Sequence, residues 1–289
     1  MLWSKVEKAI CEATEQNFSI ESRHSLGGGS ISDAYCIRGI NKAFFVKTNS
    51  ADRYEMFIAE FQGLQEIHKT KTIRVPQPIC HQVASSHSFL VLEYISLQSL
   101  SPKSQPLMGE QLAKLHKNLS DNKHFGWHRD NTIGSTPQIN TWKDNWIDFF
   151  TNCRLRFQFD LARKKGKSFK GEDELYDVIS EFFQDYNPEP SLLHGDLWGG
   201  NASADDSDQP VIYDPATYYG DRETDLAFTE LFGGFTSSFY KTYDKTYPID
   251  PGYSKRKELY NLYHILNHYN LFGGSYASQA QSIISQCLK

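Results

Sequence analysis

Cysteine is scarce in this sequence and follows no pattern that would define a fold. The 289 residues include five cysteines, an odd number, far apart and without a CxxC pair or a Cys/His spacing of the zinc type. Neither a disulfide framework nor a zinc module fits this pattern. The first residues, MLWSKVEKAICEATEQ, lack the continuous apolar stretch of a signal peptide. We therefore expect a protein of a reducing, cytoplasmic compartment.

Long apolar runs and an excess of basic charge are also missing. No apolar run approaches the roughly 18 residues that a membrane span requires. The 30 Lys and Arg residues are outnumbered by 35 Asp and Glu residues, which gives a formal net charge of −5. Because nucleic-acid binding depends on many cations that neutralise phosphates, a nucleic acid is not expected as a partner. A membrane is not expected either, because the apolar run that a span requires is missing. Hydrophobic residues at 39% and aromatic residues at 14% predict a packed core instead of disorder.

The first third of the chain alternates between helical and strand patterns. The opening helix is predicted to start with a capping box formed by Ser4 and Glu7, because Ser followed three residues later by Glu satisfies free backbone amides. Strands are predicted where short β-type runs are separated by turn residues. The expected elements are a helix at 4–13, strands at 34–37 and 43–46, a helix at 50–68, and strands at 79–83 and 89–95.

Beyond residue 95 the helical period dominates. A Ser-, Pro- and Gln-rich stretch at 97–106 is typical of a hinge. Helices are predicted at 108–119, 142–157 and 175–183 from their apolar stripes. The first two are separated by a long loop at 121–141, and unstructured connections of that length are usually functional. The sequence therefore predicts an α+β protein whose first part is built on strands and whose second part is mainly helical.

The stretch His194-Gly-Asp-Leu-Trp-Gly-Gly-Asn201, followed by Val211-Ile-Tyr-Asp214, carries the most chemical information. Kinases place in this order an aspartate that accepts the acceptor's hydroxyl proton, an asparagine that binds magnesium and an aspartate that also binds metal. Asp196, Asn201 and Asp214 follow that order. Amide and carboxylate oxygens are the hard ligands that Mg²⁺ prefers. We therefore predict Asp196 as catalytic base and Asn201 and Asp214 as Mg²⁺ ligands.

The chain before this stretch has candidates for binding ATP. Residues without a Cβ in the glycine-rich turn would let backbone amides approach phosphates. Lys47 ends a strand, and Glu60 on the following helix is its expected ion-pair partner, with Glu55 as the alternative. The residues 91–95, which lead into the predicted hinge, would present backbone N–H and C=O groups to the edge of the adenine base. The predicted nucleotide contacts are Gly27, Gly28, Gly29, Ser30, Lys47, Glu60, Glu93, Tyr94 and Ile95.

These motifs together resemble the fructosamine (ketosamine) kinase family along the whole chain. Features that resemble this family more than its aminoglycoside- and choline-kinase relatives are Leu197-Trp198, Phe232-Gly-Gly-Phe235 and Leu266-Asn-His-Tyr-Asn270. The resemblance implies a bilobal protein-kinase-like fold, with a nucleotide-binding lobe at 1–95 and a catalytic and acceptor-binding lobe at 96–289. It also implies ATP-dependent phosphorylation of the sugar C3 hydroxyl of ketosamines, such as fructosamine or ribulosamine adducts, free or on glycated protein lysines, as a deglycation step.

Several residues keep two interpretations. His194 is expected to brace the loop rather than carry a proton, and Asp225 either accepts amides from that loop or caps a helix. Trp198 would stack on the sugar or be buried between the lobes. His264 and His268 are expected to pack or, for His268, face the substrate, since no third zinc ligand accompanies them.

The resemblance leaves two departures from familiar patterns, and two rival functions stay open. The glycine loop is not GxGxxG, and Ser30 stands where several family members have cysteine, which puts redox control at that position in doubt. Asp-Pro-Ala at 214–216 replaces the Asp-Phe-Gly of protein kinases, which counts against a protein-kinase-style activation switch. Residues 205–208 read as a solvated turn, because Pro210 replaces the glycine of a calcium loop. The rival functions are an aminoglycoside- or choline-kinase-like enzyme, which would differ in an acceptor cleft built from 121–141 and the C-terminal helices, and a catalytically silent kinase fold.

Overall fold

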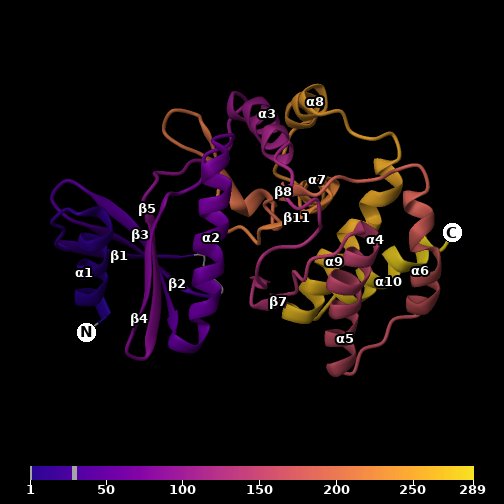
Figure 1. The fold of residues 1–289 in the computed structure, drawn as a ribbon, viewed down its shortest axis with the longest axis horizontal. Coiled ribbons are helices and arrows are strands. Elements are labelled where there is room, and N and C mark those ends of the chain that lie inside the picture. The colour runs from indigo at the N-terminus through magenta and orange to yellow at the C-terminus, as the bar shows by residue number, and fades with distance from the viewer. Residues whose placement is uncertain (1, 28–30) are drawn as a thin grey trace.

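The computed structural model describes residues 2–27 and 31–289 and shows a five-stranded antiparallel sheet followed by a mainly helical part (Figure 1). The strand order is β1-β2-β3-β5-β4. Helix α1 covers one face of this sheet, and α2 lies between the other face and the helical part. The elements of the sheet part are α1 (Leu2–Thr14), β1 (Ser22–Leu26), β2 (Asp33–Arg38), β3 (Ala43–Ser50), α2 (Tyr54–Thr70), β4 (Pro78–Ala84) and β5 (His87–Glu93).

Strand β5 shows why this sheet needs a helix on each face. Its side chains from Ser88 to Leu92 are all buried, because the strand lies inside the sheet and both of its faces are covered. Phe89 and Val91 pack with the apolar stripe of α1. Leu90 and Leu92 point to the opposite face and pack with α2. The alternation of a strand's side chains thus divides one continuous apolar run between two cores.

The helical part contains three two-stranded sheets among its helices. The pairs are β6 with β7, β8 with β11, and β9 with β10, all antiparallel. No helix among residues 2–27 and 31–289 is both long and apolar enough to cross a membrane. The helices are α3 (Ser104–His116), α4 (Trp146–Phe149), α5 (Phe157–Lys164), α6 (Glu172–Val178), α7 (Glu223–Leu231), α8 (Ser237–Thr246), α9 (Tyr253–Phe272) and α10 (Tyr276–Cys287). The strands are β6 (Asn131–Ile133), β7 (Thr136–Gln138), β8 (Ser191–Leu193), β9 (Ala202–Ala204), β10 (Pro210–Ile212) and β11 (Tyr218–Gly220).

One hydrophobic core joins the sheet part to the helical part. Phe57, Leu64 and Ile67 on α2 are buried together with Leu192 and Leu197 from the helical part. Helix α2 lies very close to the segment before β11 at Gly63. A Cβ on this residue would lie only 2.7 Å from Thr217 Oγ1, so the close packing requires glycine. Helix α2 is therefore packed against both parts.

Four sequence expectations differ from the observed elements. The Ser4–Glu7 capping box is wrong, because α1 already begins at Leu2 and Glu7 accepts the N–H of Ile20 at 2.7 Å. The loop at 121–141 includes the β6–β7 hairpin. The helix expected over 142–157 begins at Trp146, is π-helical over Phe150–Arg156 and continues as α5.

The physical reasons for two of these differences are local. Asn145 caps α4 by accepting the N–H of Asp148 at 3.1 Å, while Lys143 is still paired with Phe125, so the helix cannot extend back to residue 142. The hinge predicted at 97–106 ends at α3, which begins at Ser104, and within it Gln98 exchanges backbone hydrogen bonds with Ala204.

Candidate active site

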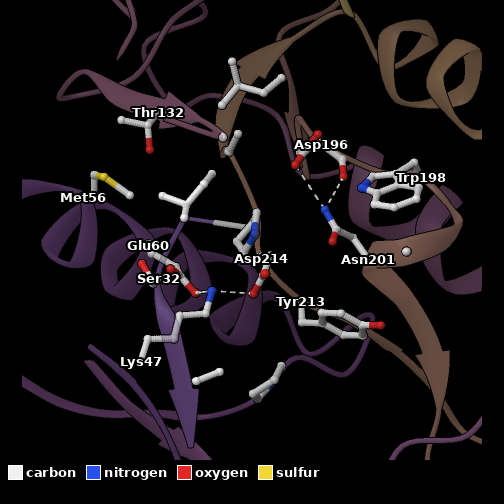
Figure 2. Close-up of a pocket in the computed structure, with 18 of the residues that line it drawn as sticks. Ser32, Lys47, Met56, Glu60, Thr132, Asp196, Trp198, Asn201, Tyr213 and Asp214 are labelled. Carbon is white, nitrogen blue, oxygen red and sulfur yellow. Dashed lines mark hydrogen bonds and ion pairs between the residues drawn. The ribbon is translucent and has the colours of Figure 1, made fainter. Parts of the chain in front are cut away.

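A cavity of about 570 Å³ lies between the sheet part and the helical part. One side of it, called here the lysine side, is formed by Lys47, Glu60, Asn201 and Asp214. A second group of lining residues, called here the aromatic side, comprises residues 131–134 together with Trp198, Asn267, His268, Leu271 and Phe272. Asp196 also lines this cavity, and Figure 2 shows it beside Asn201 and Trp198.

The lysine side is organised by one ion-pair network. Lys47 Nζ on β3 lies 2.7 Å from Glu60 Oε1 on α2 and 2.6 Å from Asp214 Oδ1 (Figure 2). Burial alone would lower the pKa of Lys47, but the two carboxylates outweigh it and raise that pKa, so the ammonium stays charged. Glu60 is therefore the partner of Lys47, while the alternative, Glu55, pairs with Arg129. Asp214 has φ +57°, a left-handed conformation that Asp tolerates better than most residues.

Asp196 and Asn201 are held together by the turn between β8 and β9. Asn201 Nδ2 donates to the main-chain carbonyl of Asp196 at 2.8 Å and to its Oδ2 at 3.1 Å. Asn201 thus uses its amide nitrogen within the turn and keeps its amide oxygen for other contacts. Burial first, and then the charge of Asp214, raises the pKa of Asp196 well above its ordinary value. A carboxylate with a raised pKa in a cavity is a typical candidate for acid–base chemistry.

The backbone before Asp196 is fixed by a buried carboxylate and a histidine. Asp225 on α7 accepts the N–H groups of His194 and Gly195, each at 2.8 Å. His194 Nδ1 accepts the N–H of Asp196 at 3.2 Å, and its Nε2 lies 2.9 Å from the carbonyl of Tyr213. The bracing roles predicted for His194 and Asp225 are confirmed. His194 also joins the base candidate to the segment that carries Asp214.

Glycine is required at the centre of the His-Gly-Asp turn. Gly195 has φ +80°, and a Cβ on it would lie 2.1 Å from the carbonyl oxygen of Ala216. That close approach allows the N–H of Ala216 to donate to His194 O at 2.8 Å. The turn and the segment after Asp214 are therefore packed backbone against backbone.

A whole-chain comparison with protein families decides which family this arrangement belongs to. The model of the fructosamine kinase family matches residues 2–289. The chain belongs to the fructosamine kinase family. A probable ketoamine kinase of Synechocystis is 47% identical over 287 residues, which cover 99% of this chain and 97% of that protein. The chloroplastic protein-ribulosamine 3-kinase of Arabidopsis thaliana is 44% identical over 269 residues, covering 92% of this chain and 82% of that protein.

Solved structures agree with this family. A Haemophilus somnus protein assigned as a fructosamine-3-kinase is 32% identical with a TM-score of 0.92, covering 99% of this chain and 98% of that one. A choline kinase from Streptococcus pneumoniae has a TM-score of 0.64 at 14% identity, covering 99% and 98% of the two chains, and shares the fold alone. The expected α+β, protein-kinase-like fold is confirmed.

Two motifs that carried the family resemblance pack against each other. The Trp198 ring folds over Gly200, where a Cβ would lie 2.3 Å from the indole. Gly199 lies against Gly233, and a Cβ on Gly199 would be 3.0 Å from the carbonyl of that residue. The glycines of the Leu-Trp-Gly-Gly and Phe-Gly-Gly-Phe motifs therefore let the turn after Asp196 meet the loop after α7. Trp198 itself lines the cavity and is 40% exposed, so it is not buried between the two parts.

The aromatic side carries no Lys or Arg side chain among the described residues that line it. The ring centroids of Trp198 and Phe232 lie 6.3 Å apart, and those of Phe232 and His268 lie 5.0 Å apart. His268 lines the cavity, whereas His264, one turn earlier, is buried and stacks on Phe228 with ring centroids 3.6 Å apart. The described residues contain no group of three or more His, Cys, Asp or Glu side chains suited to a metal.

The predicted nucleotide contacts fall into three groups. Gly27, Glu93 and Ile95 line the cavity, while Gly28, Gly29 and Ser30 lie outside the described residues. The N–H of Glu93 donates to Gln77 O at 2.8 Å, so this amide is already occupied. The N–H of Ile95 makes no hydrogen bond among the described residues. Tyr94 does not line the described part of the cavity, and its ring lies 5.1 Å from the guanidinium of Arg38.

An ion-pair network around Arg74 was missed by sequence reasoning. Arg74 bonds Glu93 Oε1 at 2.8 Å and also contacts Asp205 Oδ2. Asp205 accepts the N–H groups of Ser207 and Gln209 as well, so the solvated turn expected at 205–208 is wrong at its first residue, which is 7% exposed. No local sequence pattern can indicate a bond between two residues that lie 131 positions apart. The network ties the end of β5 to the β9–β10 turn.

Proposed function

We propose that this chain is a ketosamine kinase that transfers a phosphoryl group from Mg-ATP to the sugar C3 hydroxyl of fructosamine or ribulosamine adducts. The observation that carries the proposal is the convergence of Lys47, Glu60, Asp196, Asn201 and Asp214 on one cavity in a member of the fructosamine kinase family. The names of the relatives, ketoamine kinase and protein-ribulosamine 3-kinase, support this acceptor class.

The donor set on the lysine side fits magnesium. The amide oxygen of Asn201 and Asp214 Oδ2 accept no hydrogen bond from the described residues, although both side chains line the cavity. Two hard oxygens leave room for phosphate oxygens and water, which is how Mg²⁺ is usually held with nucleotides. When bound there, the ion would neutralise charge on the phosphates. Asn201 and Asp214 would be its protein ligands.

The remaining roles follow from charge and position. Lys47 would bind phosphate oxygens, and Glu60 would keep the ammonium directed into the cavity. Asp196 would accept the proton as the sugar oxygen forms its bond to the γ-phosphorus, while the bond from that phosphorus to the bridging oxygen of ADP breaks. Catalysis of this kind depends on positioning and on charge stabilisation. The raised pKa of Asp196 suits a group that takes up a proton.

The aromatic side would receive the sugar adduct. Trp198 would stack on the apolar C–H face of the sugar, since an exposed indole offers a flat apolar surface. His268 would contact the acceptor from α9, and residues 131–134 would form the facing wall. These assignments place the adduct between Trp198 and the end of the β6–β7 hairpin.

A product screen tests the proposed acceptor. The chain is incubated with Mg-ATP and a panel that contains fructosamine and ribulosamine adducts, choline, homoserine and an aminoglycoside, and products are identified by mass spectrometry. We expect one phosphoryl group on the ketosamines, with fragmentation placing it at C3. Transfer only to choline, homoserine or the aminoglycoside would overturn the acceptor class.

A binding measurement tests the nucleotide half separately. Thermal unfolding is recorded with ATP in the presence of Mg²⁺ and again with EDTA. A ligand at 100 times its dissociation constant stabilises the folded state by about 2.7 kcal/mol. We expect a Mg²⁺-dependent rise in melting temperature, and its absence would favour the catalytically silent alternative.

A further inference from the structure

The segment 125–134 contacts both α2 and the cavity. Its last four residues, 131–134, form part of the aromatic side. Its first half, which runs just before β6, lies against α2 and is bonded to it by side chains. A single stretch of chain therefore touches the helix that carries Glu60 and the wall that faces the acceptor.

Glu66 on α2 is held by two donors from the helical part. The indole N–H of Trp127 donates to Glu66 Oε2 at 2.6 Å, and the hydroxyl of Tyr219 donates to Glu66 Oε1 at 2.7 Å. Glu66 has no basic partner among the described residues. Trp127 is 2% exposed, so its N–H has no access to bulk water. Losing this bond would leave a buried donor unsatisfied, which is more costly than losing an exposed contact.

Arg129 contacts the same helix about one turn and about three turns before Glu66. Its Nη1 donates to Gln62 Oε1 at 3.0 Å, and its Nη2 pairs with Glu55. His128 Nε2 lies 3.1 Å from the same Gln62 oxygen. The side chains that α2 contributes are therefore Glu55, Gln62 and Glu66.

These three positions lie on one face of α2, and Glu60 lies on another. At 100° per residue, Glu55, Gln62 and Glu66 fall within roughly 40° of one another, whereas Glu60 is about 140° away from Glu55. The contacts with Trp127, Tyr219 and Arg129 therefore hold α2 on the face that points away from Lys47. Rotation of α2 by one residue, about 100°, would remove Glu60 from the ammonium. The contact of Gly63 with Thr217 prevents α2 from withdrawing without loss of packing.

We propose that Trp127 and Arg129 are positioning residues that hold α2 in the rotation at which Glu60 meets Lys47. This rests on the proposed role of Glu60 in the kinase reaction. The long loop predicted at 121–141 then has two tasks, since its 125–130 portion fixes the ion pair of the lysine side while 131–134 forms the acceptor wall. A helix held in this way has its ion pair assembled before the nucleotide arrives.

The first test needs no nucleotide. Trp127→Phe keeps an aromatic ring and removes the N–H that Glu66 accepts, together with part of the volume of the indole. Trp146→Phe is the matched control, because Trp146 is also 2% exposed and its indole N–H donates to the hydroxyl of Tyr260 at 3.2 Å instead of to α2. We expect amide hydrogen exchange in α2 to become about tenfold faster in Trp127→Phe, which corresponds to about 1.4 kcal/mol of local opening. Equal exchange in both variants would overturn the proposal.

The second test asks whether Trp127 acts through Glu60. The value of kcat/KM for Mg-ATP is measured for Trp127→Phe in the wild-type background and in Glu60→Gln. We expect a loss of about tenfold in the first and less than about twofold in the second, because residues that act on one interaction are not additive. The same factor in both backgrounds would mean a merely structural role and would overturn the proposal.

Two precautions keep these tests decisive. Arg129 is partly exposed, so Arg129→Gln repeats the cycle and the exchange experiment with a lower risk of misfolding. If the wild-type protein phosphorylates no ketosamine, the proposed acceptor class is wrong. The hydrogen-exchange comparison in nucleotide-free protein still tests whether Trp127 and Arg129 hold α2 in place. The two proposals can therefore fail separately.

Discussion

The two sides of the cavity are built in opposite ways. The lysine side is organised by charged groups, with Lys47 between Glu60 and Asp214. The aromatic side has rings and amides, and no Lys or Arg side chain among the described residues. Phosphates and magnesium need fixed charges, whereas a neutral sugar is recognised by stacking and hydrogen bonds. The difference shows how one cavity can combine general phosphoryl-transfer chemistry with a particular acceptor.

The support behind each side differs as well. The turn that carries Asp196 is held by backbone donors to the buried Asp225. Behind the aromatic side lies a network of buried amides, in which Asn131 Oδ1 accepts from Gln138 at 2.8 Å and from Asn140 at 2.9 Å. Arg154 on the π-helical segment completes it by donating to Asn140 Oδ1 at 2.8 Å. Mutations can therefore separate the two sides.

The largest expected effect is at Asp196, which belongs to the chemistry and to neither side alone. Asp196→Asn keeps the shape and removes the proton acceptor, so we expect kcat to fall about a thousandfold, within the range usual for a general base. Nucleotide binding should persist, because Lys47, Asn201 and Asp214 are untouched. Single-turnover kinetics and Mg-ATP titration check both outcomes, and full activity would remove Asp196 from the mechanism.

The sequence predicted the lysine side well because its residues occur in short motifs. Asp196 and Asn201 share one turn, and Asp214 follows β10 directly, so their order along the chain also describes their arrangement in space. Strands β2 to β5 and helix α2 were predicted for a similar reason, since the apolar period is local, whereas β1 was not. The choice of Glu60 over Glu55 stayed open in the sequence and is decided by the structure, in which Glu55 pairs with Arg129.

The long-range contacts around the cavity could not be predicted in the same way. Trp127 meets Glu66 across 61 positions, and Arg74 meets Asp205 across 131. Such contacts depend on how the two parts pack, which no local pattern contains. The π-helical turn at Phe150–Arg156 was read as an ordinary helix, because a regular apolar stripe does not reveal where the hydrogen-bond register slips.

A smaller effect, confined to the aromatic side, is expected at Arg154. This guanidinium is fully buried without a carboxylate partner among the described residues, and it lies over the rings of Tyr218 and Phe149 at 4.1 and 4.6 Å. Arg154→Met should release Asn140 and loosen the wall at Asn131. We expect KM for the ketosamine to rise about tenfold, about 1.4 kcal/mol, with KM for Mg-ATP changed less than about twofold.

The matched control for Arg154 is Arg156→Met on the same π-helical segment. Arg156 is exposed and lies over the ring of Tyr176, away from the amide network. Initial-rate kinetics with each substrate varied in turn give the two KM values. An equal rise in both KM values for Arg154→Met would show that the two sides of the cavity are not separable.

A further expected effect concerns the neutrality of the aromatic side and is measured on stability instead of on kinetics. Burial, with a minor contribution from His268, lowers the pKa of His264 to about 3, so this ring is uncharged at neutral pH. The unfolded chain would take up a proton near pH 6.5, its ordinary value. Because the unfolded state then binds more protons than the folded state, stability falls as pH drops from about 6.5 towards 3.

The replacement His264→Phe isolates this contribution. Phe can still stack on Phe228 and has no proton to gain, so the variant should lose about 2 kcal/mol less unfolding free energy than wild type between pH 7 and pH 5. Urea unfolding at the two pH values measures the difference, with His87→Phe at an exposed site on β5 as the control substitution. Were wild type and His264→Phe to show the same pH dependence, His264 would be protonated or solvated in the folded state. The aromatic side would then carry a charge behind His268, and its contrast with the lysine side would be one of degree.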